Sequence, residues 1–99
     1  MSNYREYLAQ DRRLVILRIL AELPGYNCNS SILADMLERY AHQPSRDQIH
    51  TDLAWLAEQG LVQTEKVESV RIATITQHGL DVAAGRATVP GVKRPGPGG

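Results

Sequence analysis

Few residues of this chain combine a reactive type with a spacing that would support chemistry. The three histidines, His42, His50 and His78, form no metal-ligand spacing with one another or with the single cysteine, Cys28. The sequence also contains no His-Glu-x-x-His pattern, no glycine-rich phosphate loop and no nucleophile motif. It therefore predicts no catalytic residue, no metal and no cofactor, so we do not expect an enzyme. Cys28 is expected to pack as a small apolar side chain.

Basic and hydrogen-bonding side chains offer a second kind of chemistry, the recognition of double-stranded DNA. Three of them lie in the N-terminal half of a predicted helix, the part that usually reaches base edges: Arg46, His50 and Thr51. Two lie in a predicted hairpin, where they would contact phosphates: Lys66 and Arg71. Three lie near the end of the chain and would follow a backbone or a minor groove: Arg86, Lys93 and Arg94.

The charge of the central segment opposes DNA binding. The chain has eleven basic and eleven acidic residues and a formal net charge of zero. Residues 25–60 hold two arginines against five acidic side chains, a net charge of −3. Because affinity for DNA comes chiefly from neutralising phosphates, the first helix, the hairpin and the tail would have to supply the positive charge. The alternative is that these arginines only keep a small domain in solution.

The helix that carries Arg46 has the clearest local signals in the sequence. Ser45 and Gln48 fit a capping box, apolar residues then recur at helical spacing, and Gly60 ends the helix. Residues 61–76 are rich in Val, Ile and Thr and are interrupted only at positions 68 and 69. This pattern predicts two short antiparallel strands joined by a tight turn.

Three further helices are expected, over residues 4–23, 29–40 and 76–84, the last two capped by Asn29 and Thr76. The block Leu14–Leu20 is apolar around most of the first helix, which is therefore either the central buried helix or one that also meets a partner in a dimer. Helix, short turn, helix and hairpin follow one another in the order of a helix-turn-helix with a wing. The predicted fold class is mainly α with a small antiparallel β-hairpin, a winged helix-turn-helix.

We expect one domain over residues 1–84, followed by a tail over residues 85–99. The tail contains three prolines and five glycines, which predicts a flexible segment that is mobile or ordered by a partner. The N-terminus has no signal-peptide pattern, and the longest apolar run is too short to cross a bilayer. These observations predict a cytoplasmic protein without membrane contact.

Trp55 and Asp52 lie on the same helix as Arg46. A helical wheel places Trp55 away from the centre of the buried stripe, so it either packs against the hairpin or the last helix, or anchors a protein interface. Asp52 is expected to be an ordinary solvent-facing charge.

Three segments carry a resemblance to a known family: residues 52–62, residues 75–83 and the ending Val89-Pro-Gly-Val-Lys-Arg-Pro95. Together they resemble small proteins of Mu-like phages and prophages, whose members are often labelled ArsR-type winged-helix regulators. The similarity extends over nearly the whole chain, and the ending is its most specific part because winged helices in general lack it. The resemblance implies a winged-helix fold, a phage context and a role in DNA binding.

Two hypotheses from different classes follow. In the first, the protein is a phage-derived DNA-binding transcriptional regulator that acts as a homodimer in the cytoplasm of the host bacterium. In the second, the same fold is a protein-interaction adaptor of a phage operon, which binds a phage or host protein through Trp55 and the acidic helix surface. The negative charge of residues 25–60 favours the second hypothesis, and the family resemblance favours the first.

Overall fold

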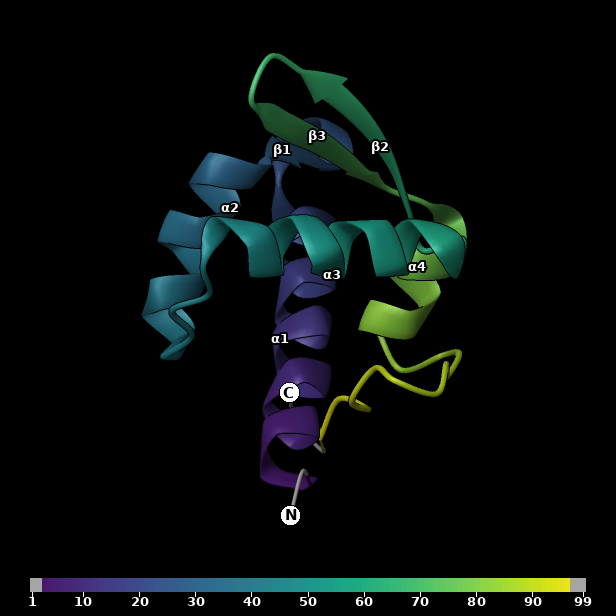
Figure 1. Cartoon of the computed structure of the whole chain (residues 1–99). Coiled ribbons are helices and arrows are strands. Elements are labelled where there is room, and N and C mark those ends of the chain that lie inside the picture. The colour runs from purple at the N-terminus through teal and green to yellow at the C-terminus, as the bar shows by residue number, and fades with distance from the viewer. Residues whose placement is uncertain (1–2, 97–99) are drawn as a thin grey trace.

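The computed structural model describes residues 3–96 and contains four α-helices and three strands within that range (Figure 1). In chain order these are α1 (Asn3–Glu22), β1 (Asn27–Asn29), α2 (Ser30–Leu37), α3 (Arg46–Glu58), β2 (Val62–Val67), β3 (Val70–Ile75) and α4 (Gln77–Ala83). Short 3-10 turns, η1 and η2, cover Pro24–Tyr26 and Glu38–Tyr40. The expectation of a mainly helical chain with a small antiparallel sheet is confirmed.

The strands form one antiparallel sheet in the order β1-β3-β2. The β2–β3 hairpin pairs Val62 with Ile75 at its base and Val67 with Val70 at its tip, and its turn lies at residues 68 and 69, where the sequence predicts it. The prediction did not include β1, which pairs with β3 from Asn27 to Asn29. A strand of three residues offers too few positions for an alternating pattern to be recognised.

The core surrounds α1, which runs behind α3 in Figure 1 and contacts α2, α4 and the sheet. Six apolar residues of α1 are buried within this one chain: Leu14, Val15, Ile16, Leu17, Ile19 and Leu20. They pack with apolar side chains of the other helices, among them Leu33, Leu53 and Val82. Internal packing therefore accounts for the apolar circumference of α1, as the first of the two alternatives proposed.

Side-chain caps begin three of the helices where the sequence predicts them. The hydroxyl of Ser45 accepts a hydrogen bond from the backbone N–H of Gln48, whose side chain bonds back to the N–H of Ser45. Asn29 and Thr76 cap α2 and α4 in the same manner, each through its side-chain oxygen. These caps satisfy N–H groups that a helix end leaves without an intrahelical partner.

After α4 the chain folds back along α1 to Gly96, the last described residue (Figure 1). The side chain of Val92 is buried with only 6% of its surface exposed, and it belongs to the core. The expectation of a flexible tail over residues 85–99 is therefore corrected for residues 85–96, while residues 97–99 lie outside the described range. In residues 3–96, no helix is both long enough and apolar enough to traverse a bilayer.

Candidate nucleic-acid interface

The N-terminal half of α3 and the tip of the hairpin meet at one edge of the molecule, which we call the hairpin edge. It is defined by Arg46, His50, Lys66 and Arg71. Lys66 and Arg71 are cross-strand partners, and they share a face of the sheet with the buried Ala73 and Ile75. Four of the eight residues predicted to contact DNA thus come together here.

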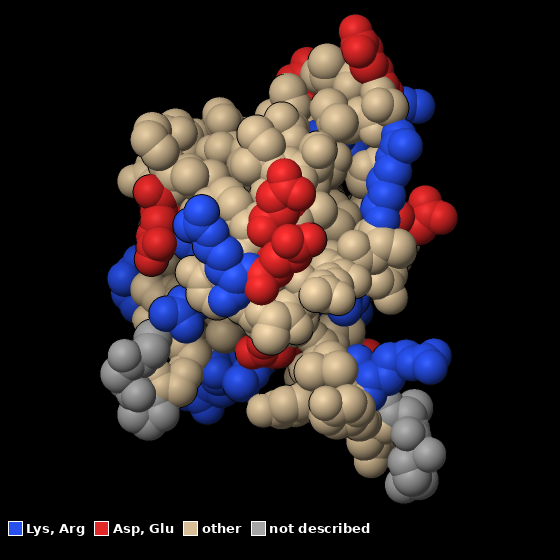
Figure 2. All heavy atoms as spheres, turned by 90° about the vertical axis from the view of Figure 1, so that its left-hand side faces the viewer, with Lys and Arg blue, Asp and Glu red and all other residues tan. Residues whose placement is uncertain are grey.

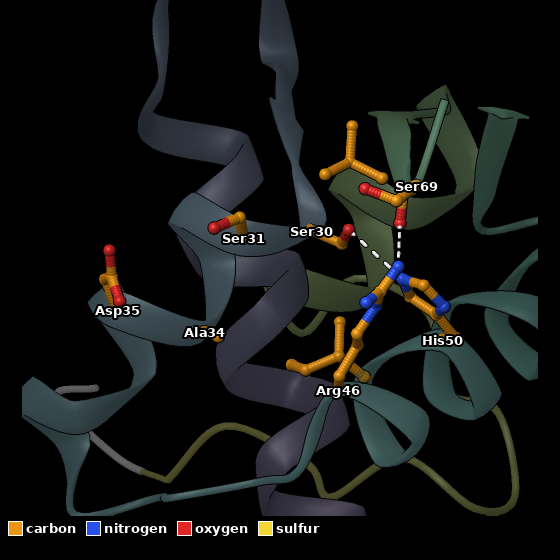
Figure 3. Close-up of a pocket in the computed structure, with 9 residues that line it drawn as sticks. Ser30, Ser31, Ala34, Asp35, Arg46, His50 and Ser69 are labelled. Atoms are coloured by element: carbon orange, nitrogen blue, oxygen red, sulfur yellow. Dashed lines mark hydrogen bonds between the residues drawn. The ribbon is translucent and has the colours of Figure 1, made fainter. Parts of the chain in front are cut away.

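Two hydrogen-bonded contacts join the hairpin to the helices below it (Figure 3). The Nη2 group of Arg46 donates to the backbone carbonyl of Ser69 in the hairpin turn at 2.8 Å. The backbone N–H of Arg71 donates to the hydroxyl of Ser30 at 3.0 Å, and that hydroxyl lies 3.3 Å from Nε2 of His50. The hairpin is therefore linked to α3 through Arg46 and to both α2 and α3 through Ser30.

A pocket of about 280 Å³ opens between these contacts, lined by residues of α2, α3 and the hairpin turn. Figure 3 shows Arg46 reaching upward from α3 beside His50, with Ser31 and Asp35 on the α2 wall. The lining combines three serines, one guanidinium, one imidazole and one carboxylate with three apolar side chains.

The positive charge of the hairpin edge acts on His50. Burial lowers the pKa of His50 below its usual value of 6.5, and the cations of Arg71, Arg46 and Lys66 lower it further, against a smaller opposite effect of Asp47. The imidazole is therefore neutral at pH 7. The fold thus brings these three cations close to one imidazole, a proximity that their positions in the sequence do not show.

Acidic side chains border this positive edge. Figure 2, a view onto the face that carries α2, shows Lys and Arg side chains in a column below the hairpin tip, with Asp and Glu side chains at the tip and beside the column. Glu68 lies in the hairpin turn, and Asp47 lies on the exposed first turn of α3. Thr51, one turn further along α3, is also exposed and accessible from the same side as Asp47. The positive patch is thus narrow.

The three predicted tail residues do not join this edge. The tail lies on the opposite side of α3 from the hairpin tip (Figure 1). Arg86 forms an ion pair with Asp81 at 3.1 Å, and Lys93 forms one with Asp11 at 3.2 Å, whereas the side chain of Arg94 is exposed. Two of these three charges are therefore already compensated within the chain.

Asp52 is buried, with 2% of its surface exposed, which corrects the expectation of a solvent-facing charge. Its carboxylate forms a bidentate pair with Arg12 of α1, and its Oδ1 atom also lies 3.6 Å from Nε of Arg13. This buried ion cluster, which we call the Asp52 cluster, joins α1 to α3. Because its charges lie inside the molecule, Arg12 and Arg13 are not available to DNA.

Trp55 lies next to the Asp52 cluster and beneath the tail, a neighbour that the sequence did not predict. The guanidinium of Arg13 lies 4.5 Å from the centre of its ring and donates to the carbonyl of Gly91 at 2.9 Å. Gly91 lies so close to the ring that a Cβ atom there would approach ring atoms to 2.6 Å. The tail therefore covers Trp55, and a glycine at position 91 is required by this contact.

A second group of charges fixes the end of the tail. The carboxylate of Asp11 bonds to Nε2 of His42 at 2.7 Å and to Nζ of Lys93 at 3.2 Å. Partial burial raises the pKa of Asp11, but the hydrogen bonds from His42 and Lys93 outweigh it, so that the pKa lies below 3.8. Lys93 also lies 5.3 Å from the ring of Tyr7. The motif Pro-Gly-Val-Lys thus packs against α1 and against Trp55 of α3.

Metal binding finds no support in the described range, since residues 3–96 contain no group of three or more His, Cys, Asp or Glu side chains arranged to hold an ion. Cys28 is buried in β1, and burial raises the pKa of its thiol. A protonated, buried thiol is a poor nucleophile.

Comparison with known proteins shows two close similarities. The chain is 49% identical over 92 residues to the uncharacterized protein gp26 of Escherichia phage Mu, an alignment that covers 93% of this chain and 95% of the phage protein. It is 46% identical over 79 residues to an uncharacterized protein of Haemophilus influenzae, covering 79% of this chain and 76% of that protein. No protein-family model matches the chain.

Proposed function

Because the chain belongs to the family of the phage Mu protein gp26, we propose that it is a phage-derived DNA-binding protein with a winged-helix fold. The order of its elements, α1-β1-α2-α3-β2-β3, is that of a helix-turn-helix followed by a hairpin. In this proposal α3 is the recognition helix and the β2–β3 hairpin is the wing. The proposed role is that of a transcriptional regulator, acting in the cytoplasm of the host bacterium.

The observation that carries the proposal is the convergence of Arg46, His50, Lys66 and Arg71 at the hairpin edge. The lowered pKa of His50 agrees with it, because the charges of Arg71, Arg46 and Lys66 add to the effect of burial. Such a concentration of positive charge costs electrostatic free energy in the free protein, and phosphate groups would relieve that cost.

The geometry supports one mode of docking. The N-terminal half of α3 would enter the major groove, where Arg46, His50 and Thr51 face base edges. Lys66 and Arg71 would lie over the phosphates that flank the groove. Because Asp47 and Glu68 border this patch, few phosphate contacts are expected, and the affinity for duplex DNA should depend only moderately on salt concentration.

A homodimer is part of the proposal. Two copies related by a two-fold axis would place two α3 helices in successive major grooves, about 34 Å apart. Sizing of the protein in solution tests this, and a monomer at the concentrations that bind DNA would contradict it.

The test of DNA binding is a salt series with the full chain and random duplex DNA. The logarithm of the binding constant falls as the logarithm of the salt concentration rises, and each phosphate contact makes this slope steeper by about 0.9. Lys66→Gln and Arg71→Gln should each make the slope shallower by roughly one contact. Arg86→Gln and Arg94→Gln are matched controls, since they remove the same charge on the far side of α3 and should leave the slope unchanged.

The second hypothesis, a protein-interaction adaptor, is favoured by one observation. Four exposed carboxylates of residues 25–60 outnumber the two arginines there: Asp35, Glu38, Asp47 and Glu58. Trp55 is an unsuitable anchor because the tail covers it. If the wild-type chain has no measurable affinity for duplex DNA at low salt, DNA binding is excluded and the acidic surface becomes the candidate site for a basic partner.

A further inference from the structure

Ser30 occupies the point at which the sheet passes into α2. The β1–β3 ladder pairs Asn29 with Ile72, and continuing the pairing by one residue would bring Ser30 opposite Arg71. At this position the chain turns into α2, and the side-chain hydroxyl of Ser30 accepts the hydrogen bond from the backbone N–H of Arg71 at 3.0 Å. The hydroxyl thereby replaces the backbone carbonyl that the next rung of the ladder would supply.

The hydroxyl of Ser30 has one proton, and that proton needs an acceptor. Ser30 is buried, with 5% of its surface exposed, and buried polar groups are almost always hydrogen-bonded. Within residues 3–96 its oxygen has two partners, the N–H of Arg71, which donates, and Nε2 of His50 at 3.3 Å. Nε2 is the partner that can accept, and it does so only when it carries no proton.

We propose that Ser30 is a positioning residue for His50, which it holds as a neutral imidazole with the proton on Nδ1. Within the described residues, Nδ1 has no hydrogen-bond partner, so this proton is free to be donated. It would be donated to an acceptor atom of DNA, a base-edge nitrogen or oxygen or a phosphate oxygen. This step of the inference rests on the proposed DNA-binding function, whereas the tautomer does not.

The contacts of Ser30 with Arg71 and His50 matter because of how the hairpin is held. In β2 only the first residue, Val62, is buried, and the buried residues of β3 are Ala73 and Ile75 near its base. The outer half of the hairpin therefore has no buried side chain to fix its direction. The link from Arg71 through Ser30 to His50, with that from Arg46 to Ser69, sets where the phosphate-contacting side chains stand relative to α3.

The charged groups that face His50 agree with a neutral ring. Arg46 and Asp47 lie on its own helix, and Lys66 and Arg71 lie on the hairpin, so that cations outnumber carboxylates around it. Protonating the ring would place a fourth cation among them and would remove the acceptor that Ser30 needs.

The test is the nitrogen-15 NMR spectrum of the histidine rings in the full-length protein at pH 7.5. The expected result is that Nδ1 of His50 carries the proton in the wild-type chain. Ser30→Ala should shift His50 toward the tautomer protonated at Nε2, whereas Ser30→Thr, which keeps the hydroxyl, should preserve the wild-type spectrum. Ser31→Ala is the matched control, because Ser31 lines the same pocket but is exposed. A wild-type proton on Nε2 would overturn the proposal.

A second measurement separates this inference from the proposed function. Ser30→Ala should weaken DNA binding by about threefold to tenfold, the loss that one misdirected hydrogen bond corresponds to. The salt slope should fall by at most the two contacts of Lys66 and Arg71, because Ser30 also holds the strand that carries Arg71. If the wild-type chain binds no DNA but its His50 carries the proton on Nδ1, the proposed function fails and the positioning role stands. A slope that falls by more than these two contacts in Ser30→Ala would show that Ser30 itself contacts phosphate and would contradict a purely positioning role.

Discussion

The two sides of α3 carry the same kinds of side chain and put them to opposite uses. On the side of the Asp52 cluster, Arg12 and Arg13 are largely buried, and the carboxylates of Asp52 and Glu6 compensate their charges. On the side of the hairpin edge, Arg46 and Lys66 are exposed and form no ion pair within the described residues. The charges of the Asp52 cluster join two helices. Those of the hairpin edge have no ion-paired carboxylate in residues 3–96, so a negatively charged ligand can meet them.

This difference changes what the net charge of a segment means. The count of −3 for residues 25–60 includes Asp52, whose charge is compensated inside the molecule by arginines of α1. The surface that a ligand meets is therefore less negative than the sequence count. Burial, rather than composition, decides which charges a partner senses.

The largest effect is expected from Asp52→Ala. Removing this carboxylate leaves the largely buried Arg12 without a compensating charge, which costs about 3–5 kcal/mol in the free energy of unfolding. Thermal unfolding followed by circular dichroism measures the loss. Glu58→Ala, on the exposed surface of the same helix, is the control and should change the free energy of unfolding by less than about 0.5 kcal/mol. Equal effects of the two variants would show that the Asp52 cluster contributes no more than a surface charge.

A smaller loss is expected from Gly91→Ala. The new Cβ atom would meet the Trp55 ring at 2.6 Å, and the residue has a φ of +99°, which side chains disfavour. The tail must shift, and we expect a loss of about 1–3 kcal/mol together with a change in Trp55 fluorescence.

Gly96→Ala is the matched control, because nothing lies within 4 Å of a Cβ atom there. In a Trp55→Ala background, Gly91→Ala should lose most of its effect. Trp55→Ala itself should lower the melting temperature by several degrees, since a partly buried aromatic side chain is removed. A full-sized Gly91→Ala effect without the tryptophan would point to backbone strain alone.

Lys66→Gln should leave the folded protein almost unchanged. The side chain is exposed and the chain offers it no carboxylate partner among the described residues, so the free energy of unfolding should change by less than about 0.5 kcal/mol. Urea unfolding at two salt concentrations measures this. A marked loss of stability would place Lys66 in a structural role, as is true of Arg12.

The smallest effects are expected in the pH dependence of stability, which differs between His50 at the hairpin edge and Asp11 beside the tail. The pKa of His50 lies below 6.5 in the folded state, so the unfolded chain binds a proton more readily, and stability falls as pH drops from about 6.5 through the folded-state pKa. Asp11, with a pKa below 3.8, loses its contribution only below that pH. Unfolding measured from pH 7 to pH 3 should lose the upper phase in His50→Gln and the lower phase in Asp11→Asn. An upper phase that persists in His50→Gln would assign it to another group.

The local signals in the sequence were sufficient for most of the helices and for the hairpin. The capping box at Ser45 and the two β-rich runs in residues 61–76 are local signals that depend on neighbours within a few positions, and the structure contains both features. The tail was mispredicted because composition describes what a segment can do alone. It does not show that Trp55 and Arg13 offer a surface on which Gly91 fits.

Asp52 could have been recognised. It lies three residues after Ile49 and four before Leu56, so helical geometry places it within the buried stripe. A carboxylate there predicts a buried cation from another element, although spacing alone does not identify Arg12 as that partner. Ser30 gave no such signal, because its role arises from the meeting of β3 and α3, two elements that follow it in the chain.

In Figure 1 the chain that follows α4 runs below α3, on the side away from the hairpin tip, and the first turns of α1 lie on that side as well. A protein attached to a sensor surface by either end would therefore present its hairpin outward. The same placement makes both ends suitable for fluorescent labels, which would report on binding without obstructing the edge that we propose to contact DNA.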